Sequence, residues 1–497
     1  MKKSICLFLI FLLPGLLLGS CTRNSTLAAA PFSNWSDRQI FSSGLIKTEQ
    51  KTLQRLEGAS IYHIDVTLAD SLTELSGYEE VRYTNQEPNG LHEVYFRLFP
   101  NAAGGSTTVS EVTQDGKTVQ AALLAGDTSL RVALSEPLKP GASTILRLNF
   151  KVQIPTKFGG TYGIFGYVND VLLLDGFYPA IPVFDTDGWH AQAPVDNADT
   201  TFQDASFYEV RVNAPANLVL AASGIQVNRE VQSDRQMVTF AAGPARDFYL
   251  AASSRFKVWS ETTGETRVNS IAFAGDEAGA KLALTTAVNA VRDYSARYGT
   301  YPYTEFDVVS GPLMNAYGIE YPGITVINQE LYDPQAEIAG TNSTVILEST
   351  VAHETGHQWF YNGVGNDQTN EPWLDESVTQ YITGEYFYDQ YGEDGYQGYR
   401  ESWISRWERV YDAEIPIGMP AGSYEGLQYS AIVYGRGPLF LEALAKQMGQ
   451  SNFDQFLRDY YQSNEWGIGS PQIFQQSAES HCQCDLTPLF EKWVEQE

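Results

Sequence analysis

Short segments in which apolar and polar residues alternate dominate the chain between residues 54 and 255. Tyr62–Leu68 and Glu93–Leu98 are typical, and turn-forming groups rich in Pro, Asn, Asp and Gly separate such segments. An alternation with a period of two predicts half-buried β-strands. Because the spacing of the segments is irregular and no sequence repeat is found, we expect an antiparallel β-sandwich or saddle rather than a propeller.

The periodicity changes after Phe256, where helical spacing replaces most of the alternation. In residues 278–298 the apolar positions recur on one face of a helix. We therefore expect a multidomain α+β protein, with a β domain over 54–255 and an α+β domain over 256–497. Strand-like runs remain at Val268–Phe273, Phe306–Val309 and Ile324–Ile327. Further helices are predicted at 341–362, 375–391, 396–412, 436–448, 452–464, 471–480 and 487–495.

The first 21 residues have the pattern of a signal peptide. Two lysines precede the apolar run Ile5–Leu18, which is too short for an untilted membrane span. The run closes on Leu-Gly-Ser-Cys, which resembles the lipobox of bacterial lipoproteins, where the cysteine (here Cys21) is lipidated. We expect an extracytoplasmic lipoprotein of the cell envelope, or a secreted protein if Cys21 is not lipidated, with residues 22–53 as a tether. Membrane contact is expected only through this N-terminal lipid anchor.

Length and charge narrow the class of protein. A chain of 497 residues predicts about two to four domains. The formal net charge of −28 argues against a nucleic-acid partner, because phosphates would be repelled. Once Cys6 leaves with the signal peptide and Cys21 is lipidated, two of the four cysteines remain, Cys482 and Cys484. They predict an oxidised surface turn or two free thiols rather than a metal site, since thiolates one residue apart chelate poorly.

One predicted helix contains His353-Glu354-Thr355-Gly356-His357. Residues four apart lie on nearly the same helix face, about 6 Å apart along the axis, so both imidazoles can converge on one ion. Glu354 is offset around the helix, too far aside to be a ligand but able to reach a water on the metal. Two of only six histidines in the chain stand in this arrangement, which predicts a metal site.

A catalytic zinc site needs a third protein ligand and an open coordination position. Glu376 is the candidate, after 18 intervening residues and at the start of the next predicted helix. Turn signals between the two helices, Asn362-Gly363 and Glu371-Pro372, allow them to pack antiparallel. We therefore predict one Zn²⁺ per chain, held by His353, His357 and Glu376.

These residues and their spacing resemble the aminopeptidase-N-like family of gluzincin zinc metallopeptidases. The resemblance implies a thermolysin-like catalytic domain after an N-terminal β domain, and peptide substrates with a free N-terminus. The family carries a Gly-x-Met-Glu-Asn motif whose Glu grips the substrate's α-amine. Here the motif is matched at Gly318 and Glu320, while Ile319 and Tyr321 depart from it. The amine-binding role is accordingly carried over to Glu320, with Gly318 beside it.

The resemblance also assigns two residues further along the chain. The family places a catalytic tyrosine beyond the second zinc helix, and Tyr434 takes that position within Tyr429–Gly437. Many members have another acidic or amide side chain of the β domain at the amine site, for which Asp175 is the nearest candidate here.

The hypothesis is hydrolysis of the first peptide bond of a peptide. Zinc activates a water, Glu354 acts as the general base, Tyr434 stabilises the oxyanion and Glu320 holds the ammonium. Three alternatives stay open: a thermolysin-like endopeptidase, an epoxide hydrolase such as the family also contains, and an inactive surface module that binds peptides. The preferred N-terminal residue, the physiological substrate and the oligomeric state are not predicted.

Overall fold

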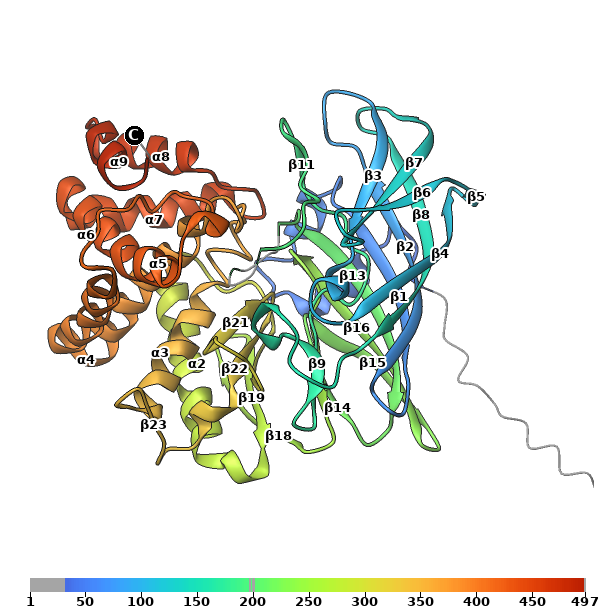
Figure 1. Cartoon of the computed structure of the whole chain (residues 1–497), viewed down its shortest axis with the longest axis horizontal. Coiled ribbons are helices and arrows are strands. Elements are labelled where there is room, and N and C mark those ends of the chain that lie inside the picture. Colours follow the sequence, from blue (N-terminus) through green and yellow to red (C-terminus); the bar gives the residue numbers. More distant parts are fainter. Residues whose placement is uncertain (1–31, 196–197, 199–201, 496–497) are drawn as a thin grey trace, which may run out of the picture. The chain divides into compact units, whose positions relative to one another are not determined.

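Strands fill the first half of the described chain and helices most of the second, which confirms the predicted α+β class (Figure 1). The structure is a computed structural model and describes residues 32–195, 198 and 202–495. The predicted signal peptide and Cys21 lie outside the described residues. Within the described part of the chain, no helix combines the length and the apolar character that a membrane span requires.

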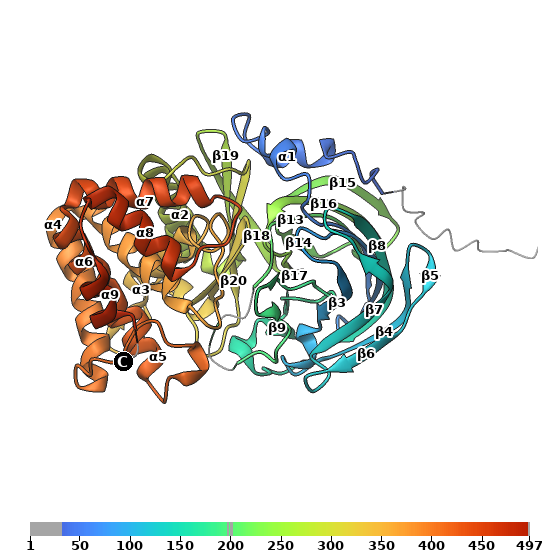
Figure 2. The ribbon, with the colours of Figure 1, turned by 90° about the horizontal axis from the view of Figure 1, so that it is seen from above.

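An eight-stranded sheet forms the largest layer of the β-rich part, in the order β15-β16-β13-β1-β2-β8-β4-β5. Figure 2 shows it as a curved layer with β3 and β9 on its inner side. Its pairings are antiparallel except that β1 runs parallel to β13, a departure from the purely antiparallel expectation. The strands are β1 (Ile61–Leu68), β2 (Glu74–Thr84), β4 (Ser106–Gln114), β5 (Lys117–Thr118), β8 (Ser143–Gln153), β13 (Ser206–Pro215), β15 (Ile225–Gln232) and β16 (Arg235–Ala245).

Smaller sheets cover the buried face of this layer. One has the order β3-β7-β6 and another the order β14-β17-β10-β9, while β11 and β12 form a separate hairpin. Alternating side chains of β8 are buried and exposed, which is the pattern that the sequence alternation predicts. The strands are β3 (Leu91–Arg97), β6 (Ala121–Leu124), β7 (Ser129–Leu138), β9 (Phe165–Val168), β10 (Val171–Leu174), β11 (Phe184–Asp185), β12 (Gly188–Trp189), β14 (Val219–Ala222) and β17 (Leu250–Ser253).

The segment before β1 packs onto the fold. Phe41 and Leu45 are 1% and 2% exposed, and Leu45 forms a β-bridge with Tyr303. The structure therefore differs from the expected tether over residues 32–53, because apolar side chains within this polar stretch are buried against the sheets. The segment contains the 3₁₀ helix η1 (Gln39–Gly44) and the short helix α1 (Thr52–Arg55).

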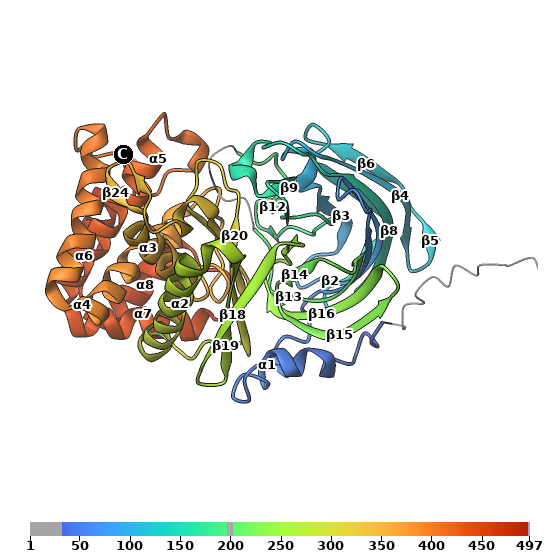
Figure 3. The same ribbon diagram turned by 90° about the horizontal axis from the view of Figure 1, so that it is seen from below.

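A five-stranded sheet opens the second part, in the order β18-β19-β20-β22-β21. Helix α2 packs on β18 and β19 and also contacts α3. Figure 3 places the sheet between the β-rich part and the helices. The strands are β18 (Phe256–Thr263), β19 (Thr266–Phe273), β20 (Glu305–Gly311), β21 (Gly318–Tyr321) and β22 (Ile324–Asn328), followed by the hairpin β23 (Glu337–Ile338) and β24 (Thr341–Asn342).

Most of the helices follow the sequence periodicity, although the short helix α5 was not predicted. The predicted helix 341–362 ends at Gly356, and the two helices predicted over 375–412 form the single α4, kinked at Gly392, whose φ is 70°. At the end of α8 a disulfide joins Cys482 to Cys484. The helices are α2 (Glu277–Arg297), α3 (Ser343–Gly356), α4 (Glu376–Trp407), α5 (Gln428–Ala431), α6 (Gly437–Met448), α7 (Gln450–Asn464), α8 (Pro471–Cys482) and α9 (Thr487–Trp493).

One apolar core continues from the β-rich part into the five-stranded sheet. Leu173 of β10 belongs to the same cluster of buried side chains as Val309 of β20 and Val326 of β22. The first strand of the five-stranded sheet begins at Phe256, where the sequence pattern changes. The domain boundary near residue 255 stays a prediction. Buried side chains from both sides of this position belong to one core.

Candidate active site

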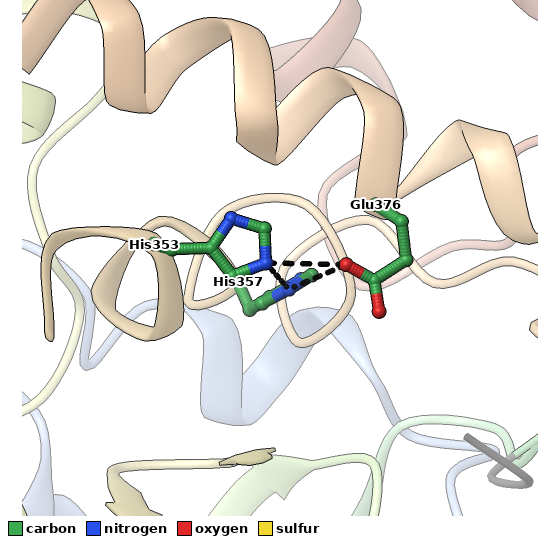
Figure 4. Close-up of side chains that lie close together, drawn as sticks. All are labelled: His353, His357 and Glu376. Carbon is green, nitrogen blue, oxygen red and sulfur yellow. Dashed lines mark hydrogen bonds and ion pairs between the residues drawn. The ribbon is translucent and has the colours of Figure 1, made fainter. Parts of the chain in front are cut away.

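Helix α3 presents both histidines of the motif toward one point (Figure 4). The Nε2 atoms of His353 and His357 are 3.1 Å apart, as expected for residues one turn apart. His353 is 7% exposed and His357 fully buried. The Nδ1–H of His357 donates to the carbonyl of Phe360 at 3.0 Å, which leaves Nε2 as the nitrogen that faces the site.

Glu376 comes to the same point from the start of α4. Its Oε2 lies 3.2 Å from His353 Nε2 and 3.4 Å from His357 Nε2. Asp375 caps this helix, because its Oδ1 accepts the backbone N–H of Glu376 at 2.7 Å. The cap thus defines the first turn of α4, and contact between α3 and α4 brings Glu376 to the histidines.

The three atoms fit a zinc ion. Tetrahedral zinc bonds of about 2.0–2.1 Å place two ligand atoms about 3.3 Å apart, and the separations observed are 3.1, 3.2 and 3.4 Å. Two imidazoles and one carboxylate are a donor set that catalytic zinc sites use, with one position left for water or substrate. Among the described residues, His353, His357 and Glu376 form one of two groups whose ligand atoms lie within 4.8 Å of one another.

Glu354 lies beside these ligands and against strand β21. Its side chain is 5% exposed, and a Cβ added to Gly318 would lie 2.6 Å from Glu354 Cγ and 2.7 Å from Cδ. Only glycine therefore lets β21 pass this close to the carboxylate. Burial raises the pKa of Glu354 well above its usual range, and the Glu320 and Glu376 carboxylates add to the rise. A carboxylate of this kind is suited to accept a proton near neutral pH.

Glu320 stands on β21, the edge strand of the five-stranded sheet, but is only 5% exposed. A carboxylate oxygen of Glu320 and one of Asp375 lie within 4.8 Å of each other and of a ring nitrogen of His357. The Nε2 of Gln368 donates to Glu320 Oε1 at 2.8 Å and to Asp375 Oδ2 at 3.0 Å. The tertiary structure thus places Glu320 next to His357, and it places Gln368 and Asp375 beside Glu320.

Tyr434 reaches the site from the π-helical segment η9 (Ile432–Arg436), between α5 and α6. Its hydroxyl donates to Glu376 Oε1 at 2.5 Å, and its ring centroid lies 6.0 Å from that of His353. Single turns of π-helix occur frequently at functional sites, where they redirect one side chain. Tyr434 is therefore a hydrogen-bond donor beside the point where His353, His357 and Glu376 meet.

Asp175 lies just after β10 and is 9% exposed. Burial raises the pKa of its carboxyl well above the usual range, the Asp247 carboxylate adds to the rise, and Arg97 opposes it. The same Asp247 accepts a hydrogen bond from the hydroxyl of Tyr361, in the loop after α3. Asp175 thus belongs to a buried charged group of the β-rich part, and its membership of the amine site stays a prediction.

The pKa values of His353 and His357 are shifted in opposite directions. Burial lowers the pKa of His353 to about 4, so this imidazole is neutral at pH 7, the form that binds metal. Burial opposes ionisation of Glu376 as well, yet the imidazoles of His357 and His353 hold its pKa below the usual range. Burial opposes ionisation of His357 too, yet the Glu320 and Glu376 carboxylates raise its pKa well above the usual range, so a metal ion that binds here displaces a proton from this imidazole.

Sequence reasoning missed Gln368 and Asp375. Asp375 immediately precedes a predicted helix, so its role as N-cap could have been read from the sequence. Gln368 carries no such signal, because its partners lie 48 and 7 residues away and the loop has no periodicity.

Comparisons with known proteins place these residues in a wider context. Residues 282–493 match the sequence model of the peptidase family M1 domain. The chain is 26% identical to canine aminopeptidase N over 262 residues, which is 50% of this chain and 26% of that protein. It is 22% identical to aminopeptidase 2 of Candida albicans over 372 residues, 72% of this chain and 39% of that protein. The chain thus spans well under half the length of these curated relatives.

Solved structures share the fold. An M1 zinc metallopeptidase from Deinococcus radiodurans superposes with a TM-score of 0.68 at 20% identity, covering 88% of this chain and 94% of that chain. A two-domain M1 zinc metallopeptidase mutant bound to L-arginine gives a TM-score of 0.66 at 18% identity, covering 89% and 95%. The β-rich part followed by the helical part is therefore an arrangement that these two-domain proteins also have.

Proposed function

We propose that the chain is a zinc-dependent aminopeptidase of the aminopeptidase-N-like family of gluzincin zinc metallopeptidases, to which its match to the peptidase family M1 domain over residues 282–493 and its likeness to aminopeptidase N point. Its substrates are peptides with a free N-terminus, from which it removes the first residue. The Zn²⁺ is held by His353, His357 and Glu376.

The observation that carries this proposal is the position of Glu320 relative to the metal ligands. A buried carboxylate oxygen of Glu320 lies within 4.8 Å of a ring nitrogen of His357. An ammonium paired with Glu320 therefore places the first peptide bond of a substrate, and no later one, beside the three ligands. An endopeptidase has no use for a buried anion at this place.

Each residue of the proposed active site has a distinct task in the reaction. Zinc, when bound, supplies Lewis acidity, which lowers the pKa of water and polarises the scissile carbonyl. Glu354 accepts the proton of the attacking water and returns it to the leaving amine. Glu320 holds the ammonium and sets the register, and the lack of a side chain at Gly318 keeps Glu354 in place beside it.

We assign Tyr434 to stabilisation of the negative charge that develops on the carbonyl oxygen. Its hydroxyl lies at the metal ligands, where it donates to Glu376. A hydroxyl that donates to the oxyanion in a protein site stabilises the transition state by about 3 to 4 kcal/mol. Such a donor is worth more in a site that excludes water than it would be in solution.

Three measurements test the proposal. A chelator such as phenanthroline should abolish cleavage of leucine anilide, and added Zn²⁺ should restore it. Glu320→Ala should raise KM strongly for free-amine substrates, because a buried ion pair with the ammonium is lost. Cleavage of N-acetylated peptides at internal bonds by the wild-type enzyme, with no preference for a free amine, would contradict an aminopeptidase and favour an endopeptidase.

We further propose that the protein is a cell-envelope lipoprotein, anchored through Cys21 after removal of the signal peptide. The proposal is supported by the apolar run and the lipobox-like Leu-Gly-Ser-Cys sequence. Expression in a bacterial host with labelled palmitate should label the wild-type protein and not Cys21→Ser. Equal labelling of both would remove the anchor from the proposal.

A further inference from the structure

Gln368 connects two carboxylates that the sequence does not bring together. Its single Nε2 donates to Glu320 Oε1 at 2.8 Å and to Asp375 Oδ2 at 3.0 Å. All three side chains are at least 95% buried: Glu320 is 5%, Gln368 2% and Asp375 1% exposed. A primary amide has two N–H donors, so one group can satisfy an acceptor on each side.

A neutral amide is suited to this position. Two carboxylates within 4.8 Å of each other repel in a buried site, and hydrogen bonds to both offset the repulsion. A lysine or arginine would form the same bonds but would also neutralise the carboxylates. The amide leaves the negative charge of Glu320 in place for a cationic group of another molecule.

The loop that carries Gln368 is fixed on both sides of it. Asp367 accepts the backbone N–H groups of Thr369 and Asn370 at 3.1 and 3.0 Å, which makes a tight turn, and its Oδ2 lies 3.4 Å from His190 Nδ1. On the other side, the carbonyl of Thr369 accepts the N–H of Ala421 at 2.8 Å. A side chain between two such fixed residues has little freedom, so it can define where its partner lies.

The bonds of Gln368 also tie the amine site to the metal ligands. Asp375 accepts from Gln368 through one oxygen and from the backbone N–H of Glu376 through the other. A continuous path of hydrogen bonds therefore runs from Glu320 through Gln368 and Asp375 to the residue that faces both histidines. The path thus connects the position of the Glu320 carboxylate to that of the first residue of α4.

We propose that Gln368 is a positioning residue that holds Glu320 for recognition of the substrate's α-ammonium, with Asp375 fixing Gln368 to the start of α4. The inference rests on the proposed aminopeptidase function. A positioning role differs from a role in loop packing. A positioning residue acts through Glu320 and affects only binding of the amine, whereas a loop-packing residue would affect the whole site.

The experiment uses the zinc-loaded full chain and the variant Gln368→Met, which keeps the length of the side chain and removes both N–H donors. The control is Gln380→Met, a glutamine 4% exposed on α4 whose amide oxygen accepts from the hydroxyl of Tyr399. Calorimetry measures binding of L-leucine, which has an ammonium, and of acetohydroxamate, which binds zinc without one. Zinc content and the KM and kcat for leucine anilide complete the set.

We expect Gln368→Met to weaken L-leucine binding and raise KM about tenfold, as loss of hydrogen bonds to a charged group does. Binding of acetohydroxamate, zinc content and kcat should change less than about threefold. In a Glu320→Gln background the same substitution should add little, because residues that act through one another are not additive. The control should leave L-leucine binding unchanged.

Unchanged L-leucine binding by Gln368→Met, an equal loss for both probes, or full additivity with Glu320→Gln would overturn the inference and leave the proposed function standing. Wild-type enzyme that neither binds L-leucine nor cleaves leucine anilide would overturn both. If Gln368→Met does not fold, Gln368→Ser decides the matter, since its short polar side chain cannot reach both carboxylates. Wild-type affinity for L-leucine in that variant would likewise overturn the inference.

Discussion

Two neighbouring groups of buried side chains in this protein are built in different ways. The proposed metal ligands His353 and His357 stand one turn apart on α3, and Glu376 opens the next long helix. The proposed amine site joins Glu320 of an edge strand to Gln368 of a loop and to Asp375. The first group follows from helix geometry, whereas the second exists only where β21, the loop and α4 meet.

The difference has consequences for tolerance to substitution. A helical pair keeps its geometry as long as the helix persists, because the separation of residues i and i+4 is fixed by the backbone. A site assembled from three segments depends on each contact that holds those segments, including contacts that never touch a ligand. We therefore expect changes around Glu320 to alter binding of the amine while the metal ligands keep their ion.

The largest effect is expected from Glu354→Gln, which separates the chemistry from metal binding within α3. Loss of the general base should lower kcat about 10³-fold, while zinc content stays at one per chain because the three ligands are intact. Kinetics on leucine anilide measure kcat, and atomic absorption measures the zinc content. Glu348→Gln is the control on the same helix, where the side chain accepts from Tyr391 at 2.7 Å. A variant at Glu354 with activity near that of the control would remove the base assignment.

A smaller loss is expected from Gly318→Ala, which tests the contact between the two groups. The added Cβ would lie 2.7 Å from Glu354 Cδ, so the carboxylate must move. A displacement of about 1 Å costs on the order of 10²-fold in rate, and we expect kcat to fall by 10- to 100-fold with zinc retained.

Gly398→Ala on α4 provides the comparison, since a Cβ there meets open space. Wild-type kcat in Gly318→Ala would show that β21 can retreat from Glu354. The close approach would then be incidental to the position of the base.

The smallest effect is expected from His190→Asn, at the bridge that holds the Gln368 loop. His190 Nε2 lies 2.8 Å from Asp185 Oδ2 and Nδ1 lies 3.4 Å from Asp367 Oδ2, with Phe202 against the ring. The hydrogen bond to Asp367 and that to Asp185 raise the pKa of His190 above 6.5, although burial opposes the rise.

A raised pKa in the folded state gives stability that is fully present below about pH 6.5 and is lost as pH rises through the folded pKa. Urea unfolding should therefore show the wild type more stable than His190→Asn at pH 6, with the difference shrinking toward pH 9. His92→Asn on β3 is the exposed control. A difference that stays constant or grows with pH would mean that the bridge is not an ion pair. Zinc content should be equal in all three proteins.

Much of the fold could be predicted from periodicity. Helix α2 begins and ends within one residue of its predicted bounds, since one apolar face repeats over its whole length. Longer-range features could not be predicted. The parallel pairing of β1 with β13 joins residues about 145 positions apart, and nothing local distinguishes a parallel from an antiparallel neighbour. The burial of Phe41 and Leu45 likewise depends on surfaces formed by later segments.

The sequence by itself determined the metal-ligand pattern, because two histidines four residues apart need only a helix to converge. It also marked Glu354 and, through the family resemblance, Glu320 and Tyr434. Only the tertiary structure decided that Gln368 joins Glu320 to Asp375, and that Gly318 leaves room for Glu354. The physical reason is that periodicity encodes contacts within one element, whereas contacts between elements are set by how buried polar groups find partners once the chain has folded.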